Sequence, residues 1–144
     1  GNLGALLRSC DGLGADWVIL TGHGVDLYDP EVVTASMGSF FRVPAVQVEN
    51  REAEAFIQQL RQQYPGFQTV GATAHRERPL YGEDLRGPVM LLLGNETDGL
   101  SYAYKHSCDV LCTIPMAAES SASSFNVACA ATVLLYEAAR QRAT

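Results

Sequence analysis

Short apolar runs alternate along this chain with longer segments whose apolar residues recur at helical spacing. The most apolar run, PVMLLLG at residues 88–94, ends in a glycine and is followed by the polar pair Asn95-Glu96. Strands that alternate with helices are typical of a mostly parallel sheet with helices on both faces. The sequence therefore predicts an α/β fold.

The periodicity places the expected elements along the whole chain. Apolar runs predict strands at residues 16–22, 42–48, 67–74, 88–94 and 110–116. Helical spacing predicts helices at residues 2–14, 29–38, 51–65, 98–107 and 124–142. Gly12 and Gly14 should end the first helix, whereas Asp29 and Pro30 should begin the second. The expected buried stripe of the last helix comprises Val127, Ala130, Ala131, Leu134, Leu135 and Ala138.

Length, charge and hydropathy narrow the class of protein. A chain of 144 residues fits one domain with a substantial core. Its net charge of −6 argues against a domain that holds nucleic acid by bulk charge, but it leaves room for a local basic patch. No window reaches the roughly 18 apolar residues of a membrane span, and the N-terminal residues lack the layout of a signal peptide. We therefore expect a soluble, cytoplasmic domain with no membrane partner.

The four cysteines indicate neither a metal site nor a disulfide framework. Three residues separate Cys108 from Cys112, but no second cysteine pair or histidine-rich segment completes a zinc set. Because no secretory signal is present, we expect free buried thiols and no metal. The cysteines concerned are Cys10, Cys108, Cys112 and Cys129.

Ligands of parallel sheets bind beyond the carboxyl ends of the strands. Those positions fall at Gly22, Gly71, Gly94 and Pro115-Met116. The G-x-G-x-x-G fingerprint of a dinucleotide site is missing, so a nucleotide-binding regulator of the α/β class is disfavoured.

Three segments, each at a junction of strand and helix, carry a family resemblance. They are NLGALLRSCDGLGAD (2–16), MLLLGNETDGLS (90–101) and CTIPMAAESSASSFNVACAATVLLYEAAR (112–140). In this order they resemble the three signature motifs of the SpoU/TrmH family, the S-adenosylmethionine-dependent RNA 2′-O-ribose methyltransferases of the SPOUT superfamily. Residues 29–46 are also similar to the family's linking segment, so the resemblance extends over residues 1–144.

The resemblance implies a fold that periodicity does not predict. SPOUT domains have a mostly parallel sheet flanked by helices and a deep trefoil knot in the C-terminal half, which is an exception to the rule against threaded chains. The family also implies a homodimer and S-adenosylmethionine bound in a pocket formed by the loops of the knot. Residues 1–144 would then form the SpoU-type methyltransferase catalytic domain.

Matched position by position, the resemblance assigns the cofactor contacts. They are Thr73, Gly94, Ile114, Met116 and Phe125. An apolar slot with backbone polar groups at its edge suits an adenine ring, and glycine at position 94 lets the backbone approach a ligand closely. The third motif of the family usually reads Ser-Leu-Asn, so Phe125 implies a pocket of different shape near the adenine.

The resemblance assigns the catalytic centre to Asn2, Arg8, Glu96, Ser124 and Asn126. A guanidinium stays protonated at neutral pH, so we expect Arg8 to hold the target phosphate and stabilise a developing alkoxide rather than act as a base. Glu96 would hold Arg8 or Asn126 in place. Simpler explanations exist for four of them: Ser124 or Asn126 as a cap of the last helix, Glu96 as a turn carboxylate, and Arg8 as a solvated helix residue.

Family members normally have a strand ahead of the position of Asn2, and many carry an N-terminal RNA-binding domain, so we expect upstream residues in the full protein. The implied function is methylation of a ribose 2′-hydroxyl in rRNA or tRNA, with rRNA slightly preferred by analogy with two-domain rRNA enzymes. The alternative is a SPOUT-like RNA-binding or assembly protein without catalysis. The joint presence of all the catalytic-centre residues disfavours that alternative.

Overall fold

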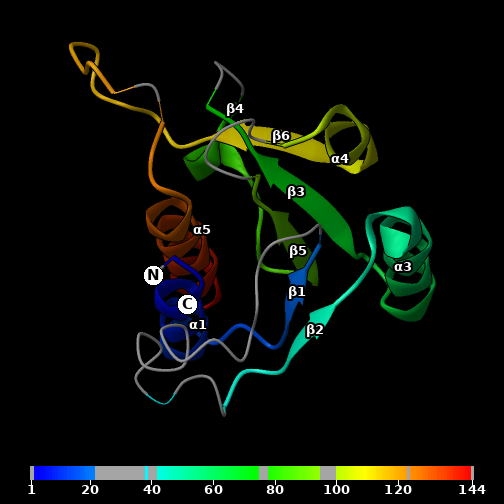
Figure 1. The fold of residues 1–144 in the computed structure, drawn as a ribbon. Coiled ribbons are helices and arrows are strands. Elements are labelled where there is room, and N and C mark those ends of the chain that lie inside the picture. Colours follow the sequence, from blue (N-terminus) through cyan, green and yellow to red (C-terminus); the bar gives the residue numbers. More distant parts are fainter. Residues whose placement is uncertain are drawn as a thin grey trace.

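A computed structural model describes residues 2–21, 38, 42–74, 78–94, 100–122 and 124–143. Strands and helices alternate along the chain (Figure 1). The strands are β1 (Val18–Leu20), β2 (Ala45–Gln47), β3 (Gln68–Ala72), β4 (Arg78–Pro79), β5 (Val89–Leu92) and β6 (Val110–Thr113). The helices are α1 (Asn2–Leu13), α3 (Asn50–Gln63), α4 (Tyr102–Ser107), α5 (Val127–Arg142) and the short 3₁₀ helix η2 (Leu80–Gly82).

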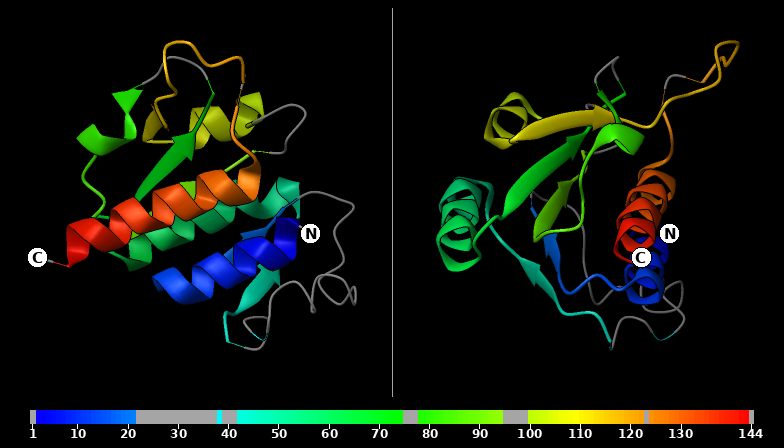
Figure 2. Two further views of the ribbon diagram at one scale, coloured as in Figure 1. Left: turned by 90° about the vertical axis from the view of Figure 1, so that its left-hand side faces the viewer. Right: turned by 180° about the vertical axis from the view of Figure 1, so that it is seen from behind.

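Every strand pair that the structure describes is parallel. Strand β1 pairs with β2, and the other strands lie in the order β4-β6-β3-β5. Helices α1 and α5 lie side by side on one face, whereas α3 and α4 lie on the opposite side (Figures 1 and 2). The expected α/β fold, with parallel sheets flanked by helices, is confirmed.

Two apolar clusters join these layers. In the first, Leu134 of α5 packs against Val70 of β3. In the second, Leu7 of α1 packs against Val18 of β1, and Leu135 of α5 lies against the same cluster. Helix α5 therefore contacts both clusters. Burying a leucine side chain stabilises a fold by about 1.5–3 kcal/mol, so Leu7 and Leu134, which are 0% and 1% exposed, are major contributors.

The buried stripe of α5 differs from the expected one at its first turn. Its buried residues are Ala128, Ala131, Leu134 and Ala138. The prediction was wrong in placing Val127 and Ala130 there in place of Ala128, since both are only half-buried. Leu135 is also half-buried, because it faces α1 rather than the sheet.

Glycine and proline end the helices where the sequence predicted. Gly14 follows the last residue of α1 with a φ of +81°, a conformation that a residue without a Cβ adopts at little cost. Helix α3 ends at Gln63, shortly before Pro65. The helix expected at residues 29–38 lies outside the described residues, apart from Gly38.

Gly71 allows α4 and its flanking residues to lie close to β3. A Cβ at this position would lie 2.7 Å from the Cys108 Sγ and 2.9 Å from methyl carbons of Leu100 and Leu111. These separations are shorter than van der Waals contact, so alanine would force the neighbours apart. Glycine at this point therefore serves packing within the sheet layer rather than contact with a ligand.

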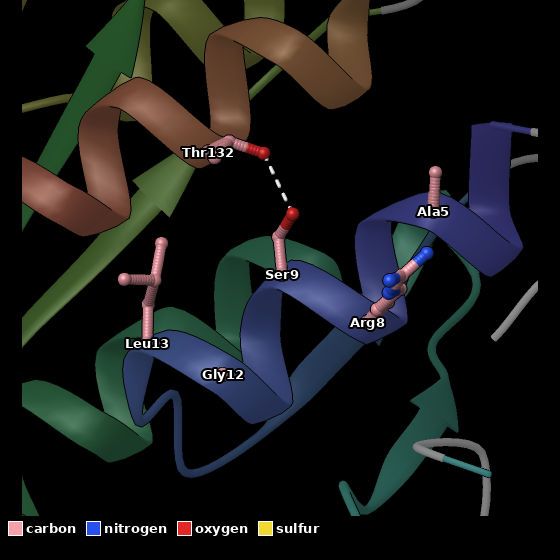
Figure 3. Close-up of a pocket in the computed structure, with 6 residues that line it drawn as sticks. All are labelled: Ala5, Arg8, Ser9, Gly12, Leu13 and Thr132. Atoms are coloured by element: carbon pink, nitrogen blue, oxygen red, sulfur yellow. Dashed lines mark hydrogen bonds between the residues drawn. The ribbon is translucent and has the colours of Figure 1, made fainter. Parts of the chain in front are cut away.

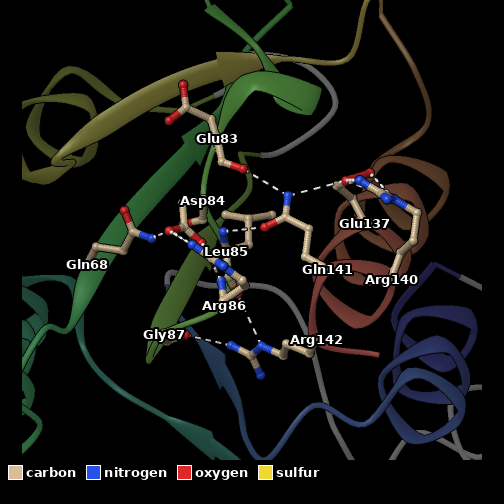
Figure 4. Close-up of polar contacts among 10 residues, drawn as sticks. All are labelled: Gln68, Glu83, Asp84, Leu85, Arg86, Gly87, Glu137, Arg140, Gln141 and Arg142. Carbon is tan, nitrogen blue, oxygen red and sulfur yellow. Dashed lines mark hydrogen bonds and ion pairs between the residues drawn. The ribbon is translucent and has the colours of Figure 1, made fainter. Parts of the chain in front are cut away.

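Residues 78–87 form structure that periodicity did not predict. Strand β4 has only two residues, one of them a proline, and it exists because Arg78 and Pro79 lie beside Cys112 and Thr113 of β6. The segment that follows is attached to the end of α5 (Figure 4). Gln141 accepts from the Leu85 N–H at 2.7 Å and donates to the Glu83 carbonyl at 2.8 Å.

The cysteines are free thiols, as expected, but not all are buried. Cys10 and Cys112 are buried and Cys108 is half-buried, whereas Cys129 is exposed on α5, so the expectation of burial was wrong there. Burial raises the pKa of Cys10 and of Cys112 to about 11. The described residues contain no cluster of side chains that suits a metal ion, and none of their helices is long and apolar enough to cross a membrane.

Candidate functional site

The carboxyl ends of β5, β3 and β6 bring expected cofactor contacts to one edge of the sheet. Continued by two residues, the register of β3 with β5 places Gly94 level with Thr73. On the other side, the Thr73 N–H donates to the Cys112 carbonyl at 2.9 Å, two residues before Ile114. Thr73, Gly94 and Ile114, which are far apart in sequence, therefore meet at the edge where ligands of parallel sheets bind.

The Thr73 hydroxyl is the unusual group at this edge. Its Oγ1 atom is buried and has no hydrogen-bond partner among the described residues. A buried polar atom without a partner costs about 1–3 kcal/mol, and such atoms are rare in native proteins. Thr73 is therefore suited to hydrogen bond with a ligand at the carboxyl edge.

The segment after β6 supplies apolar surface beside Thr73. Ile114 and Met116 are half-buried, and Ile114 packs against the core below the sheet edge. Phe125 is 42% exposed at the far end of the same segment. Between them, residues 117–122 are all exposed, and the segment extends away from the body of the protein (Figure 1).

Asn2 and Asn126, which the resemblance assigns to one centre, lie together. The Asn126 Nδ2 donates to the Asn2 Oδ1 at 3.0 Å, which joins the start of α1 to the start of α5. The Asn126 Oδ1 also accepts from the N–H groups of Ala128 and Cys129, so Asn126 is the N-cap of α5. The explanation of Ser124 as that cap was wrong, because the helix begins at Val127 and Ser124 lies two residues too early.

Arg8 lies apart from this asparagine pair. It is exposed on α1, six residues after Asn2, a separation of about 9 Å along a helix. It borders an open groove of about 510 Å³ between α1 and α5, lined by Ala5, Arg8, Ser9, Gly12, Leu13 and Thr132 (Figure 3). This groove is distinct from the carboxyl edge that carries Thr73, so within one chain the structure does not bring Arg8 to Thr73 or to the asparagine pair.

The groove contains a hydrogen bond that sequence analysis did not identify. Ser9 and Thr132 face each other, with their hydroxyl oxygens 2.7 Å apart (Figure 3). Thr132 also donates to the Ala128 carbonyl one turn earlier in α5. Small hydroxyl residues on the facing sides of two predicted helices were the only signal in the sequence.

Glu96 lies outside the described residues, so its expected contact with Arg8 or Asn126 lies outside them too. Ser124 is described and is exposed beside the Asn126 cap. Of the expected catalytic centre, the structure thus brings together Asn2 and Asn126, with Ser124 close in sequence.

A polar network that sequence analysis missed occupies the opposite, amino edge of the sheet. The Thr69 side chain is fully buried, and its Oγ1 accepts from the Asp109 N–H at 2.9 Å and from the Arg61 Nη2 at 3.0 Å. The Asp109 Oδ2 accepts from the Thr69 N–H at 2.8 Å and from the Arg61 Nη1 at 2.7 Å. Burial alone would raise the pKa of Asp109, but the hydrogen bonds from Arg61 and Thr69 outweigh it and lower the pKa.

Comparisons with known proteins agree with these motifs. The model of the SpoU rRNA Methylase family matches residues 1–136. The 23S rRNA (uridine(2479)-2′-O)-methyltransferase of Streptomyces viridochromogenes is 45% identical over 143 residues, which are 99% of this chain and 49% of the relative. The 23S rRNA (guanosine-2′-O-)-methyltransferase RlmB of Pseudomonas putida is 36% identical over 98% of this chain and 54% of the relative.

A solved structure is similar over the same extent. The crystal structure of the SpoU methyltransferase AviRb from Streptomyces viridochromogenes, in complex with AdoMet, superposes with a TM-score of 0.90 at 44% identity. It covers 98% of this chain, and this chain covers 53% of it, so the chain spans about half the length of the relatives it matches. The family match includes the first two motif segments and the third up to residue 136, and the chain belongs to the SpoU rRNA methylase family.

Proposed function

We propose that this chain is the catalytic domain of an S-adenosylmethionine-dependent enzyme that methylates a ribose 2′-hydroxyl in RNA, with rRNA preferred to tRNA. The hydrogen bond between Asn2 and Asn126 carries the proposal, because it joins the first and third family motifs across 124 residues of sequence. The names of the relatives as 23S rRNA methyltransferases support it further. Since the chain spans about half of those relatives, the activity and substrate of the whole protein belong to the proposal.

The proposed cofactor is S-adenosylmethionine, which supplies a methyl group on a sulfonium when it is bound. Thr73 fits such a ligand because its buried Oγ1 lacks a partner among the described residues and would gain one. Ile114, Met116 and Phe125 would form the apolar wall against the adenine. Gly94, half-buried at the end of β5, would offer its backbone without a Cβ in the way.

Asn2 and Asn126 would position the ribose, since their paired amides stand at the adjoining ends of α1 and α5. The exposed Ser124 would lie against the same nucleotide. Arg8 would hold the target phosphate, and its charge would stabilise the alkoxide that forms as the hydroxyl loses its proton. Glu96 would hold Arg8 or Asn126 in place.

We propose a homodimer in which the face formed by α1 and α5 is shared by two copies of this chain. Val133 and Tyr136, which are one turn apart on α5, are 40% and 59% exposed, and adjoining exposed apolar side chains of this kind mark interaction surfaces. Cys129 lies on the same face, one turn before Val133. The groove that contains Arg8 borders this face. A second copy seated there would carry Arg8 to the catalytic centre of its neighbour, which explains why Arg8 lies far from Asn2 in its own chain.

The similarity to a solved SpoU structure supports two further parts of the proposal. The loops after β5 and β6 would form a deep trefoil knot, and residues 1–144 would act as one methyltransferase domain. An enzyme that acts on ribosomal RNA would work in the cytoplasm.

Transfer of tritium from labelled S-adenosylmethionine to total rRNA and total tRNA tests the activity, followed by mapping of the modified ribose. Label in one ribose of rRNA would support the proposal, whereas label in tRNA alone would move the substrate to that class. Absence of label in both would contradict the proposed activity.

Calorimetry with S-adenosylmethionine separates the enzyme from the alternative of a non-catalytic RNA-binding protein. Binding that Thr73→Val weakens is expected for the enzyme, and absence of binding would favour the alternative. Light scattering tests the dimer: the wild-type mass should be twice that of the chain, and Val133→Glu should reduce it to that of a monomer.

A further inference from the structure

Tyr81 is displayed on the surface beside the carboxyl edge of the sheet. It lies in η2, directly after β4, and it is 72% exposed, the highest value among the large apolar side chains that the structure describes. An aromatic side chain that is exposed to water contributes less to stability than one that is buried, because burial of its apolar surface is favourable. The ring is therefore a candidate for contact with a partner.

Arg78, three residues earlier, presents a fixed positive charge on the same segment. Its Nε lies 2.8 Å from the Glu83 Oε1, and its Nη2 donates to the Glu83 Oε2 at 3.2 Å. The Glu83 side chain is only 7% exposed, whereas that of Arg78 is 67% exposed. The surface thus presents the cation while the carboxylate that orients it is hidden. The contacts with Glu83 involve the Nε and Nη2 atoms, so the Nη1 donors of the guanidinium take no part in them.

The segment that carries both side chains is held firmly. Leu80 and Leu85, on either side of Tyr81, are 5% and 0% exposed within the first apolar cluster. The Glu83 N–H donates to the Leu80 carbonyl at 3.0 Å, and the Glu83 carbonyl accepts from Gln141 of α5 (Figure 4). Tyr81 and Arg78 are thus presented on a rigid support, which lowers the entropy lost when they bind a partner.

The same segment lies next to the expected cofactor contacts. Pro79 pairs with Thr113, the residue before Ile114, and Arg78 is the fifth residue after Thr73. Seen from behind, η2 lies beside the carboxyl end of β6 (Figure 2). A nucleotide chain that enters the carboxyl edge from this side would pass over Arg78 and Tyr81, which we call the Arg78–Tyr81 surface.

The chemistry of this surface fits single-stranded RNA. Exposed bases stack on aromatic rings regardless of their sequence, and a guanidinium binds phosphate through its planar donors. A chain with a net charge of −6 must hold a polyanion through local groups of this kind.

We infer that the Arg78–Tyr81 surface binds an unpaired nucleotide next to the one that is methylated, with Tyr81 stacked on the base and Arg78 on its phosphate. This inference rests on the proposed function for the identity of the RNA. The binding of single-stranded RNA to this surface does not depend on the proposed function.

Fluorescence anisotropy with a labelled single-stranded RNA of twelve nucleotides tests Tyr81. Tyr81→Ala should weaken binding roughly tenfold, the range expected for loss of one stacked base, whereas Tyr81→Phe, which keeps the ring, should bind within twofold of wild type. Tyr81→Leu should behave as the alanine variant, because it keeps apolar area without a π face. The matched control is Tyr64→Ala, since Tyr64 is 44% exposed at the end of α3, before the amino end of β3.

The salt dependence of the same binding tests Arg78. Removal of one phosphate contact should reduce the slope of log affinity against log salt concentration by about 0.7. Because Arg78→Ala would leave Glu83 buried without its partner, the informative variant is the double substitution Arg78→Gln with Glu83→Gln, checked for an unchanged melting temperature. Arg51→Ala is the control: Arg51 is 79% exposed on α3 and is likewise paired with a glutamate, Glu49.

Unchanged affinity in Tyr81→Ala together with an unchanged salt slope in the double variant would overturn the inference. Equal weakening by Tyr64→Ala and Arg51→Ala would also overturn it, because the effect would then belong to the surface in general. Binding to RNA strands can be measured whether or not methyl transfer occurs. Loss of the proposed function would appear as absence of transfer with these affinities intact, which distinguishes the two failures.

Discussion

A threonine lies near each end of strand β3: Thr69 is its second residue, and Thr73 directly follows its last. The two hydroxyl groups differ in their hydrogen bonds. At the amino end, the Thr69 hydroxyl takes part in hydrogen bonds with Arg61, Ser107 and Asp109. At the carboxyl end, the Thr73 hydroxyl is equally withdrawn from water but has no hydrogen-bond partner among the described residues. The same residue type thus stabilises the fold at one end and stays available at the other.

We therefore expect the amino end of β3 to contribute mainly to stability and the carboxyl end to contribute mainly to function. At the amino edge, the polar atoms of Thr69 and Asp109 form hydrogen bonds with Arg61 and Ser107 of the same chain. At the carboxyl edge, the Thr73 Oγ1 has no partner within the part of the chain that the structure describes, and Phe125 and residues 117–122 are exposed. These features reduce stability unless a partner covers them. Changes at the amino edge should therefore affect folding, and changes at the functional groups should affect activity.

Arg8→Ala provides the largest expected effect. If Arg8 stabilises charge in the transition state, its removal should lower the rate of methyl transfer at least a hundredfold. The melting temperature and the affinity for S-adenosylmethionine should stay close to wild type, because Arg8 is exposed on α1. Rates from single-turnover transfer and affinities from calorimetry measure the two quantities. Equal loss of rate and cofactor affinity would contradict the role.

Thr69→Val should give the next largest effect, on stability. Valine keeps the shape but removes the hydroxyl, so the Ser107 carbonyl, the Arg61 Nη2 and the Asp109 N–H each lose one hydrogen bond. We expect a loss of about 2 kcal/mol in the free energy of unfolding, measured by urea denaturation. Methyl transfer per folded molecule should be unchanged at low temperature. A loss of activity without a loss of stability would contradict the structural role of the amino edge.

Thr73→Val is the matched substitution at the other end. Because the Thr73 Oγ1 is buried without a partner among the described residues, removal of the hydroxyl should leave the free energy of unfolding unchanged or raise it, by up to about 1–3 kcal/mol. The affinity for S-adenosylmethionine should fall roughly tenfold, which corresponds to about 1.4 kcal/mol. Titration calorimetry on the two valine variants measures the affinity for S-adenosylmethionine, and urea denaturation measures the free energy of unfolding. Destabilisation of about 2 kcal/mol by Thr73→Val would show that the two ends do not differ.

The smallest expected effect is the pH dependence that Asp109 adds at the amino edge. Its pKa is lowered in the folded protein, so the stability it contributes is complete above the unfolded value of about 3.9. That contribution disappears as the pH falls through the lower folded value. The difference in unfolding free energy between wild type and Asp109→Asn should thus be constant near neutral pH and shrink below about pH 4. It should stay under about 1 kcal/mol, because the Asp109 side chain is 40% exposed.

Elements with a strong local signal could be predicted from the sequence. The apolar run at 88–94 gave β5, Gly14 marked the end of α1, and the spacing of Ala131, Leu134 and Ala138 gave the face of α5 that packs on the sheet. The family motifs assigned Asn2 and Asn126 to one centre, but their hydrogen bond was not predicted, since no local pattern links residues so far apart.

The remaining features depend on tertiary contacts. Strand β4 is too short to carry a period, and it becomes a strand only because β6 lies beside it. The choice of Asn126 over Ser124 as the cap of α5 depends on where the chain enters the helix, which the bond to Asn2 helps to fix. The network at the amino edge joins Arg61 and Asp109 across 48 residues, a separation at which sequence periodicity holds no information.

Helices α1 and α5 can meet only after Thr132 has been made, since the hydrogen-bonded Ser9 and Thr132 are 123 residues apart. A ribosome adds about 5–20 residues each second, so α1 waits on the order of ten seconds for its partner during synthesis. Contacts between residues so distant in sequence also form slowly in the released chain. Throughout that interval the face of α1 that carries Leu7 and Cys10, fully packed in the finished protein, has no helix to cover it. Helix α1 is therefore a segment of the nascent chain that a chaperone would protect until α5 has been made.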